Sequence, residues 1–349
     1  MRAETKHRRN AKSAKWCKIQ VYTNGNLSFL YRSISSYHMT DIAIIILTFN
    51  EELNLPETLD LIKGWAREIF IIDSYSTDRT VDIALSHKHE GLCIVQHAFE
   101  DYSKQWNWAL THLPISAAWS LKLDADERVT KEFKTEVNNL VKNASSELEG
   151  VFFRRKIVFM GRMINWGGIR ENYDLRMWRT GCATFEERAV NEHAIVRGGI
   201  TKLKSYVLHA NTKSIADWLD KHNRYSSLEA ISLISGKMTG DIQPRCFGDP
   251  AQQRMLLRMI YYAIPLRASA HFIYRFILRG GFLDGRYGFW YTFLKSVYLY
   301  WIGLKVHEYK MTGILPDVIW PQRGLPHPAL GGAYASVSQS NNDQESKEI

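Results

Sequence analysis

The chain has 349 residues, of which 45% are hydrophobic and 23% are charged. This composition is typical of a globular protein and excludes a mainly disordered or fibrous chain. The four cysteines form no CxxC pair and no metal-ligand spacing, so a disulfide scaffold is excluded and free thiols in a reducing compartment are expected. The length favours two domains, or one domain with a large appendage.

The net charge of +9 is unevenly distributed along the chain. Residues 1–40 contain eight Lys and Arg against one acidic residue, and residues 254–310 contain nine against two. Residues 41–253 contain 26 against 29 and are nearly neutral. A nucleic-acid-binding protein more often has basic charge on its folded body. Two basic flanks around a neutral body favour a membrane surface as partner and argue against nucleic acid.

The first part of the central region predicts alternating strands and helices. Residues 42–47 are a continuous apolar run, which is typical of a strand buried on both faces. Further strands are predicted at 69–72, 93–95 and 119–123, and helices at 52–66, 76–86, 102–113 and 130–141. This alternation predicts βαβ units and an α/β fold, with helices on both faces of a mainly parallel sheet.

After residue 141 the alternation stops. The sequence then predicts strands at 151–159, 174–179, 189–196 and 203–208, followed by one long helix at 214–235. Residues 254–310 hold 15 aromatic side chains in 57 positions, mixed with Arg and Lys. This mixture is typical of helices that lie in a bilayer interface, although an ordinary aromatic core is the alternative. No run of about 20 apolar residues and no secretory signal is found.

Two aspartates lie directly after the predicted strand 119–123. Asp124 and Asp126, one residue apart, can present their carboxylates to one Mg²⁺ or Mn²⁺ ion. The alternative is a solvated acidic turn before a helix, where carboxylates are favoured in any case. The chain has no GxGxxG after its first predicted strand and no GxxxxGK[ST], so a dinucleotide-binding fingerprint and a P-loop are not supported.

Polar residues also follow the first two predicted strands, where open α/β sheets bind ligands. Asp73 ends the second strand and can accept a hydrogen bond from a base or a ribose. Thr77 and Asp78, just after it, are better explained as capping residues of the next helix. The residues in the equivalent position after the first strand are Thr48, Phe49, Asn50 and Glu51.

These motifs carry a family resemblance. Thr48-Phe-Asn-Glu-Glu, Asp73-Ser-Tyr-Ser-Thr-Asp-Arg-Thr and Asp124-Ala-Asp-Glu, in this order and spacing, resemble the family 2 glycosyltransferases with a GT-A fold. Downstream, Glu187-Arg-Ala-Val-Asn-Glu-His, Leu208-His and Trp218-Leu-Asp-Lys-His-Asn-Arg-Tyr resemble a subgroup that includes bacterial lipopolysaccharide-core glucosyltransferases. The resemblance covers residues 41–310. It implies inverting transfer of a sugar from a nucleotide-sugar, usually a UDP-sugar, with a divalent cation.

The resemblance also implies roles for single residues. It implies that Asp73 holds the nucleobase, that Asp126 binds the metal, and that Asp124 contacts the ribose or the metal-bound water. The metal would stabilise the charge that develops on the leaving diphosphate. The residues expected to line the nucleotide pocket are Thr48, Asn50 and Glu51.

The remaining site predictions concern the acceptor side and the sugar. Inversion in one displacement needs a general base beside the acceptor hydroxyl. Glu192 is the candidate, Glu187 is its rival, and a structural salt bridge is the alternative reading of Glu192. His209 is predicted to complete the metal or diphosphate site as a neutral imidazole, and Gln105 to contact the donor sugar.

The expected organisation follows from these observations. Four segments are expected. Residues 1–40 form a flexible basic extension, and residues 41–240 form a GT-A catalytic domain. Residues 241–325 form a helical, aromatic and basic membrane-association region, and residues 326–349 form a disordered tail. Residues 1–38 precede Met39 and are expected to be dispensable. The expected acceptor is a lipid-anchored glycan, reached from the inner face of the cytoplasmic membrane.

Two other functions compete with this interpretation. A sugar transferase to polyprenyl phosphate would share the donor chemistry and differ in its lipid acceptor. A non-catalytic basic protein would bind anionic lipid or nucleic acid through residues 1–40 and 254–310, with a steep dependence on salt. The second alternative leaves the acidic residues at the strand ends without a role.

Overall fold

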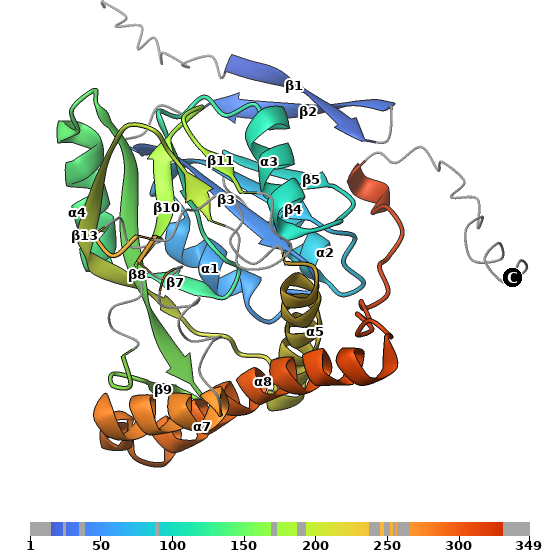
Figure 1. Cartoon of the computed structure of the whole chain (residues 1–349). Coiled ribbons are helices and arrows are strands. Elements are labelled where there is room, and N and C mark those ends of the chain that lie inside the picture. The colour runs from blue at the N-terminus through green and yellow to red at the C-terminus, as the bar shows by residue number, and fades with distance from the viewer. Residues whose placement is uncertain are drawn as a thin grey trace, which may run out of the picture.

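The computed structural model describes residues 39–87, 91–168, 173–186, 193–236, 245–247, 252–253, 256 and 266–330, and the backbone of 15–23 and 26–34 (Figure 1). In the N-terminal segment, β1 (Lys15–Thr23) pairs antiparallel with β2 (Asn26–Ile34). This hairpin forms its own two-stranded sheet and shares no strand pairing with the central sheet. These two strands are not among those expected from the sequence.

The centre of the molecule is a sheet of nine described strands in the order β5-β4-β3-β6-β10-β8-β13-β7, with β9 paired to β8. The first four are parallel, as the βα alternation predicts: β3 (Thr40–Thr48), β4 (Ala66–Asp73), β5 (Leu92–Gln96) and β6 (Trp119–Lys122). The second half is mixed, and only β8 and β13 are parallel neighbours in it. Its strands are β7 (Glu127–Val129), β8 (Leu148–Phe159), β9 (Arg162–Met163), β10 (Tyr173–Arg179) and β13 (Gly199–His209).

Helices cover both faces of this sheet. Side chains of β3 alternate between two cores, with Ile42, Ile44 and Ile46 in one and Ala43 and Ile45 in the other. The first core also receives α1, α2 and α4, and the second receives α3. The helices are α1 (Leu55–Ile62), α2 (Thr80–Ser86), α3 (Tyr102–His112) and α4 (Lys131–Asn143). The predicted α/β architecture, with helices on both faces of the sheet, is therefore confirmed.

Two predicted elements differ in extent. The helix expected over 52–66 is shorter, because Pro56 marks its first turn and the strand β4 already begins at Ala66. Of the strand expected over 189–196, the described part contributes Ala194–Ile195 (β12), which pairs with Thr184–Phe185 (β11).

The C-terminal part is helical. The helix α5 (Ile215–Ile234) begins with a capping box between Ser214 and Asp217, as a Ser followed three residues later by an acid predicts. It packs against α8 (Gly285–Thr312), where Lys305 Nζ donates to Asn223 Oδ1 at 2.7 Å. Shorter helical segments precede α8 and follow it: α7 (Arg267–Phe272), η2 (Ile273–Leu278), η3 (Gly281–Asp284) and η4 (Pro328–Leu330).

The segments α7, η2 and α8 form the lower edge of the molecule in Figure 1. Gly288 permits the tight turn into α8, because a Cβ there would meet the carbonyl oxygen of Gly281 at 2.1 Å. Asp284 joins this turn to the sheet domain by accepting hydrogen bonds from the amides of Asn165 and Trp166. None of the helices in the described part of the chain is long and apolar enough to cross a membrane.

Candidate functional site

Asp73 joins three loops at the carboxyl edge of the parallel strands. It is fully buried, and its carboxylate accepts hydrogen bonds from Thr48 Oγ1 (3.1 Å), the Ser76 amide (2.9 Å), Gln96 Nε2 (2.9 Å) and the Ser76 hydroxyl. A buried carboxylate needs such donors to offset the loss of water. Asp73 therefore lies where it was expected, but its oxygens are bonded to the protein itself. Thr48, also buried, is one of these donors.

Asn50 shapes the loop after β3. Its φ of 54° is left-handed, a conformation that Asn tolerates better than most residues. Its side chain accepts a hydrogen bond from the Thr77 amide at 2.8 Å, which ties it to the loop after β4. Of the two residues interpreted as helix caps, Asp78 does accept the amide of Thr80, at the start of α2, whereas Thr77 is bonded to Asn50.

Glu51 lies between this loop and the chain that leads into α5. Its carboxylate accepts from Lys213 Nζ at 2.7 Å and from Asn54 Nδ2 at 2.8 Å. Burial raises the pKa of Glu51, Lys213 acts in the opposite direction, and the nearby Asp126 raises the pKa further. Glu51 and Asp126, which follow adjacent parallel strands, are thus part of one acidic site.

Asp124 is paired with an arginine. Arg176, a buried residue of β10, donates from Nη2 to Asp124 at 2.8 Å and from Nη1 to both carboxylate oxygens of Glu127, at 2.7 and 2.6 Å. Arg155 on β8 lies 3.7 Å from Asp124. Burial would raise the pKa of Asp124, but Arg176 and the other cations hold it well below its usual range. Asp124 was expected to contact the ribose or the metal-bound water, and its arginine partner was not expected from the sequence.

Asp126 faces a histidine. His209 is the last residue of β13 and pairs with Glu127 in the sheet, and the Ala210 amide donates to the carbonyl of Asp126 at 2.8 Å. These strand contacts place His209 Nδ1 3.1 Å from Asp126 Oδ1. Burial alone would raise the pKa of Asp126, but His209 and Lys221 outweigh it and lower the pKa to about 2. Asp126 is therefore ionised at neutral pH.

Lys221 on α5 supplies positive charge to the same site. Burial lowers the pKa of its amine, but the acidic groups around it, Asp126 first among them, outweigh burial and raise it. The lysine is therefore charged at neutral pH and lies where it can stabilise negative charge on a ligand. In the sequence, Lys221 lies in the motif Trp218-Leu-Asp-Lys, which carries the subgroup resemblance, but it was not expected at the donor or metal site.

Asp126 and His209 could supply two of the ligands of a divalent cation, but not a complete set. Within the described residues, no group of three or more His, Cys, Asp or Glu is arranged to hold a metal ion. However, His209 Nδ1 is buried and makes no hydrogen bond of good geometry to those residues, although it lies 3.1 Å from Asp126 Oδ1. One carboxylate oxygen and one imidazole nitrogen suit Mn²⁺ better than Mg²⁺, which prefers oxygen ligands, and phosphate oxygens and water would complete the shell.

The remaining predicted site residues are placed differently. Gln105 is buried on α3, where its amide bonds to His97 Nδ1 at 2.7 Å and lies 3.4 Å from Ser74 Oγ. It supports the loops after β4 and β5 from within the protein. Glu187 and Glu192, the candidate bases, lie outside the described residues.

Three basic residues of the site were not expected from the sequence: Arg155, Arg176 and Lys213. A signal was available for Arg176, because a charged residue inside the apolar run Leu175-Arg-Met-Trp must be paired if it is buried. The partners of such a residue depend on the neighbouring strands, which the run itself does not indicate.

The fold and the candidate site together define an α/β protein in which carboxylates and cations gather at the carboxyl edge of the parallel strands. Residues 43–196 match the family model described as Glycosyl transferase family 2. The chain therefore carries a family 2 glycosyltransferase domain, and it is an enzyme of the glycosyltransferase class.

Relatives of the chain carry glycosyltransferase names. It is similar to the lipopolysaccharide core biosynthesis glycosyltransferase LpsC of Rhizobium meliloti (strain 1021), with 25% identity over 79% of this chain and 96% of LpsC. An uncharacterized glycosyltransferase of Rickettsia bellii (strain RML369-C) is 26% identical over 70% of this chain and 80% of its own length. Among solved structures, S. aureus TarS 1-349 aligns with a TM-score of 0.41 and 15% identity, over 78% of this chain and 92% of that chain.

Proposed function

We propose that this enzyme transfers a sugar from a nucleotide-sugar, a UDP-sugar in the first instance, to a membrane-anchored glycan such as a lipopolysaccharide core. The observation that carries the proposal is the Asp126 and His209 pair, 3.1 Å apart at the end of β6 and beside Lys221. The domain match gives the class of reaction. The name of the relative LpsC supports the choice of acceptor.

The proposed chemistry is the departure of a nucleoside diphosphate. A divalent cation held by Asp126 and His209 would supply Lewis-acid stabilisation of the leaving diphosphate. Lys221 adds a positive charge that interacts electrostatically with Asp126, so a cation is already present where charge develops on the leaving group. Arg176 keeps Asp124 and Glu127 neutralised, so that the acidic floor does not repel the diphosphate.

The proposed general base is Glu192, with Glu187 as its rival. A single displacement requires a carboxylate near the acceptor hydroxyl. The support for either residue is the family resemblance of the motif that contains both. Glu192→Gln and Glu187→Gln, assayed in parallel, separate the two candidates, because only the base should lose turnover with unchanged nucleotide affinity.

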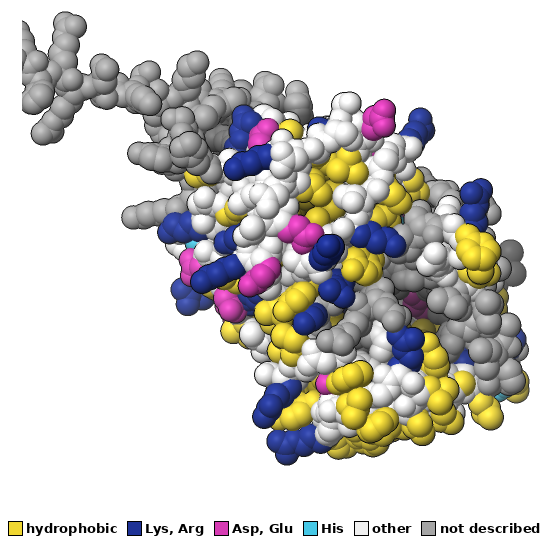
Figure 2. Space-filling view, turned by 90° about the vertical axis from the view of Figure 1, so that its left-hand side faces the viewer, with side chains coloured by type: hydrophobic (Ala, Val, Ile, Leu, Met, Phe, Trp, Pro, Cys, Tyr) yellow, Lys and Arg dark blue, Asp and Glu magenta, His cyan; other side chains and the backbone are white. Residues whose placement is uncertain are grey.

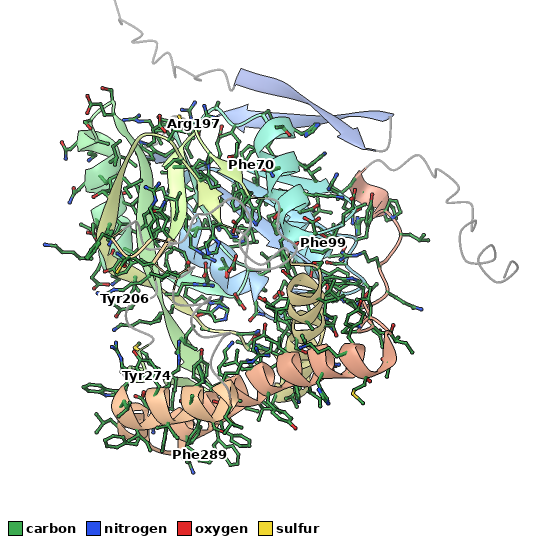
Figure 3. All side chains as sticks on the ribbon, in the orientation of Figure 1. Phe70, Phe99, Arg197, Tyr206, Tyr274 and Phe289 are labelled. Atoms are coloured by element: carbon green, nitrogen blue, oxygen red, sulfur yellow. The ribbon has the colours of Figure 1, made fainter. Side chains whose placement is uncertain are left out.

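We also propose that the enzyme binds the cytoplasmic leaflet through the surface made by α7, η2, η3 and α8. Figure 2 shows hydrophobic side chains gathered along the lower edge of the molecule, where Figure 1 places these helices. Figure 3 labels Phe289 below the helices, on the side away from the sheet. The large apolar side chains exposed here include Ile273, Tyr274, Ile277, Leu278, Phe282, Leu283, Trp290 and Phe293. This surface suits insertion at headgroup depth.

The test of the proposed donor and metal is a thermal-shift screen of nucleotides and nucleotide-sugars, with Mn²⁺ or with EDTA. A ligand that binds the native state raises the melting temperature, so UDP species should stabilise the protein in Mn²⁺ and lose most of the effect in EDTA. Stabilisation by another nucleotide would change the donor assignment. No shift with any nucleotide would contradict the proposed function.

Asp126→Ala tests the residue that carries the proposal. We expect turnover to fall by about 100-fold or more, because an electrostatic stabiliser of the leaving group is lost, while the circular dichroism spectrum is kept. The matched control is Asp60→Ala, whose exposed carboxylate on α1 lies 3.9 Å from His87. Wild-type turnover in Asp126→Ala would refute the metal assignment.

A further inference from the structure

The chain that follows α8 returns across the carboxyl edge of the parallel strands. We call residues 320–327 the C-terminal strap. The Trp320 ring lies 5.4 Å from the Phe99 ring, the Gly324 amide donates to the Tyr75 carbonyl at 2.8 Å, and the His327 amide donates to Gln96 Oε1 at 2.7 Å. The strap therefore contacts the loops that follow β4 and β5, which also hold Asp73. In Figure 1 this segment rises from the end of α8 toward α2.

The approach of the strap to these loops is close. A Cβ at Gly324 would lie 2.9 Å from the carbonyl oxygen of Ser76 and 3.4 Å from that of Tyr75. Both neighbours are backbone atoms, so they cannot move aside as the end of a flexible side chain would. A residue larger than glycine at this position would push the strap away from the loop after β4.

Arg323 is the residue that the strap brings to this edge. Its Nη1 donates to the Ser74 carbonyl, and its guanidinium lies 4.5 Å from the Phe49 ring centroid and 5.0 Å from the Phe99 ring centroid. Phe49 follows β3 and Phe99 follows β5, so one cation joins the loops of three adjacent strands. Figure 3 labels Phe99 in this part of the molecule.

The guanidinium has unused binding capacity. It carries five N–H donors, and within the described residues it makes the one hydrogen bond to Ser74 and no ion pair. Burial lowers the pKa of Arg323, with Tyr102 and Asp73 opposing. A cation held by two rings over a ligand site, with most of its donors open, is suited to an anionic or oxygen-rich ligand.

The order of the strands indicates which part of a bound nucleotide would lie beside Arg323. The strands run β5-β4-β3-β6, so Asp126, after β6, and Arg323, over the β4 and β5 loops, lie on opposite sides of β3. A nucleotide whose diphosphate lies at Asp126 and Lys221 extends its nucleoside toward Arg323. The aromatic rings of Phe49 and Phe99 suit a planar base on that side.

We propose that Arg323 binds the nucleoside part of the donor nucleotide, and that the C-terminal strap closes the nucleoside side of the donor pocket. This inference rests on the proposed function, because it takes the donor to be a nucleotide. It adds a specificity-determining residue from a segment outside the matched domain, residues 43–196.

The test is binding of UDP and of pyrophosphate, each with Mn²⁺, to the full chain by isothermal titration calorimetry. In Arg323→Ala we expect UDP affinity to fall by about tenfold or more, the loss of a hydrogen bond made by a cation, with pyrophosphate affinity unchanged. Arg323→Lys should recover little, because an ammonium lacks the planar fork. In turnover assays the KM for the donor should rise and the KM for the acceptor should not.

Two further variants keep the test decisive. Gly324→Ala keeps the guanidinium but displaces the strap, so it should also weaken UDP binding, with its melting temperature recorded to show that the protein is folded. Arg67→Ala, at the amino end of β4 where Arg67 pairs with Asp41, is the matched control and should bind UDP as the wild type does.

Each outcome bears on a different claim. If the wild type does not bind UDP, the proposed donor is wrong, and the role of Arg323 in binding its nucleoside is overturned with it. If the wild type binds UDP and Arg323→Ala binds it equally well, the inference is overturned and the strap is structural. If Arg323→Ala binds UDP more tightly, the strap competes with the nucleotide, and the proposed role of Arg323 is likewise overturned.

Discussion

Arg176 is a charged residue between the apolar Leu175 and Met177 of β10, and it holds two carboxylates at the floor of the site. Its guanidinium bonds both oxygens of Glu127, which is completely buried, and one oxygen of Asp124. Breaking a buried ion pair by removing one partner leaves a buried charge uncompensated, which is more costly than replacing both partners. The residue therefore matters for folding as much as for the electrostatics of the site.

We expect Arg176→Met to lower the free energy of unfolding by about 3–5 kcal/mol, measured by urea denaturation. The double variant Arg176→Met with Glu127→Gln should recover part of this loss, because the buried carboxylate is then neutral. A loss below about 1 kcal/mol in the single variant would show that the pair adds little to stability.

Lys295 is a second residue whose charge is costly in the folded state. Its amine donates to His222 Nε2 at 3.0 Å, and His222 in turn bonds the Trp218 carbonyl at 2.8 Å through Nδ1. Burial, with Arg275 and two further cations, lowers the pKa of Lys295 to about 7. Burial and Lys295 lower the pKa of His222 to about 2, so His222 is a neutral acceptor at physiological pH.

The pH dependence of stability follows from Lys295. Between about pH 7 and its ordinary pKa of 10.5, the unfolded chain holds a proton that the folded protein has released, so the contribution of Lys295 to stability rises with pH. Below pH 7 both states are charged and the folded state bears the full cost. We expect Lys295→Met to be more stable than the wild type at pH 6, by up to about 4 kcal/mol, and this advantage to shrink by pH 9.

Urea denaturation at pH 6, 7.5 and 9 measures this difference. Lys310→Met, at an exposed position on α8, is the control and should differ from the wild type by the same small amount at every pH. An advantage of Lys295→Met that does not change with pH would mean that the lysine is not neutralised in this range.

At the scale of elements, the β1 and β2 hairpin is separate from the sheet that carries the site. It pairs only within itself in the described part of the chain, and β3 begins at Thr40, whose amide donates to the Trp65 carbonyl at 2.8 Å. The central strands therefore keep their hydrogen bonds without residues 1–38.

We expect a chain that begins at Met39 to have the turnover and the melting temperature of the full chain. Glycosyl transfer to a short soluble acceptor and differential scanning fluorimetry measure the two properties. An inactive or strongly destabilised truncation would show that the basic extension belongs to the working enzyme.

At the scale of the whole molecule, the site and the exposed apolar surface are linked by α5 and α8. Lys221 of α5 lies near the acidic site. Lys305 of α8 donates hydrogen bonds to three residues of α5: Asn223, Ser226 and Ser227. A membrane on the surface of α7, η2 and α8 would thus lie at a fixed position relative to the donor pocket. Such an arrangement suits an acceptor that is anchored in lipid while the donor arrives from solution.

We expect the protein to bind anionic vesicles of phosphatidylglycerol and phosphatidylcholine in flotation assays, more weakly at high salt because part of the attraction is electrostatic. Leu278→Ser with Trp290→Ser, two side chains that are 71% and 49% exposed, should reduce binding severalfold. Leu85→Ser with Ile200→Ser, exposed residues of the sheet domain, is the matched control. Equal binding by both double variants would place the membrane contact elsewhere.

Local pattern determined the parallel half of the fold and the position of the acidic motifs. A strand such as 42–47 and the helices between strands can be predicted because periodicity depends on neighbours in the chain. The parallel order of those strands brings Thr48, Asp73 and Asp124 to one edge, so the sequence predicted the location of the candidate site. The family resemblance of the same motifs is confirmed by the match of residues 43–196.

Tertiary structure decided the partners of those residues. Arg176 lies 52 positions from Asp124, and Arg323 lies 249 positions from Ser74, so neither contact leaves a trace in local pattern. The first depends on how the mixed half of the sheet closes against β6, and the second on where the chain goes after α8. The charge of a buried side chain indicates that it must be paired, and periodicity indicates which face of an element is buried. The partner itself is determined by the packing of elements that are distant in the sequence.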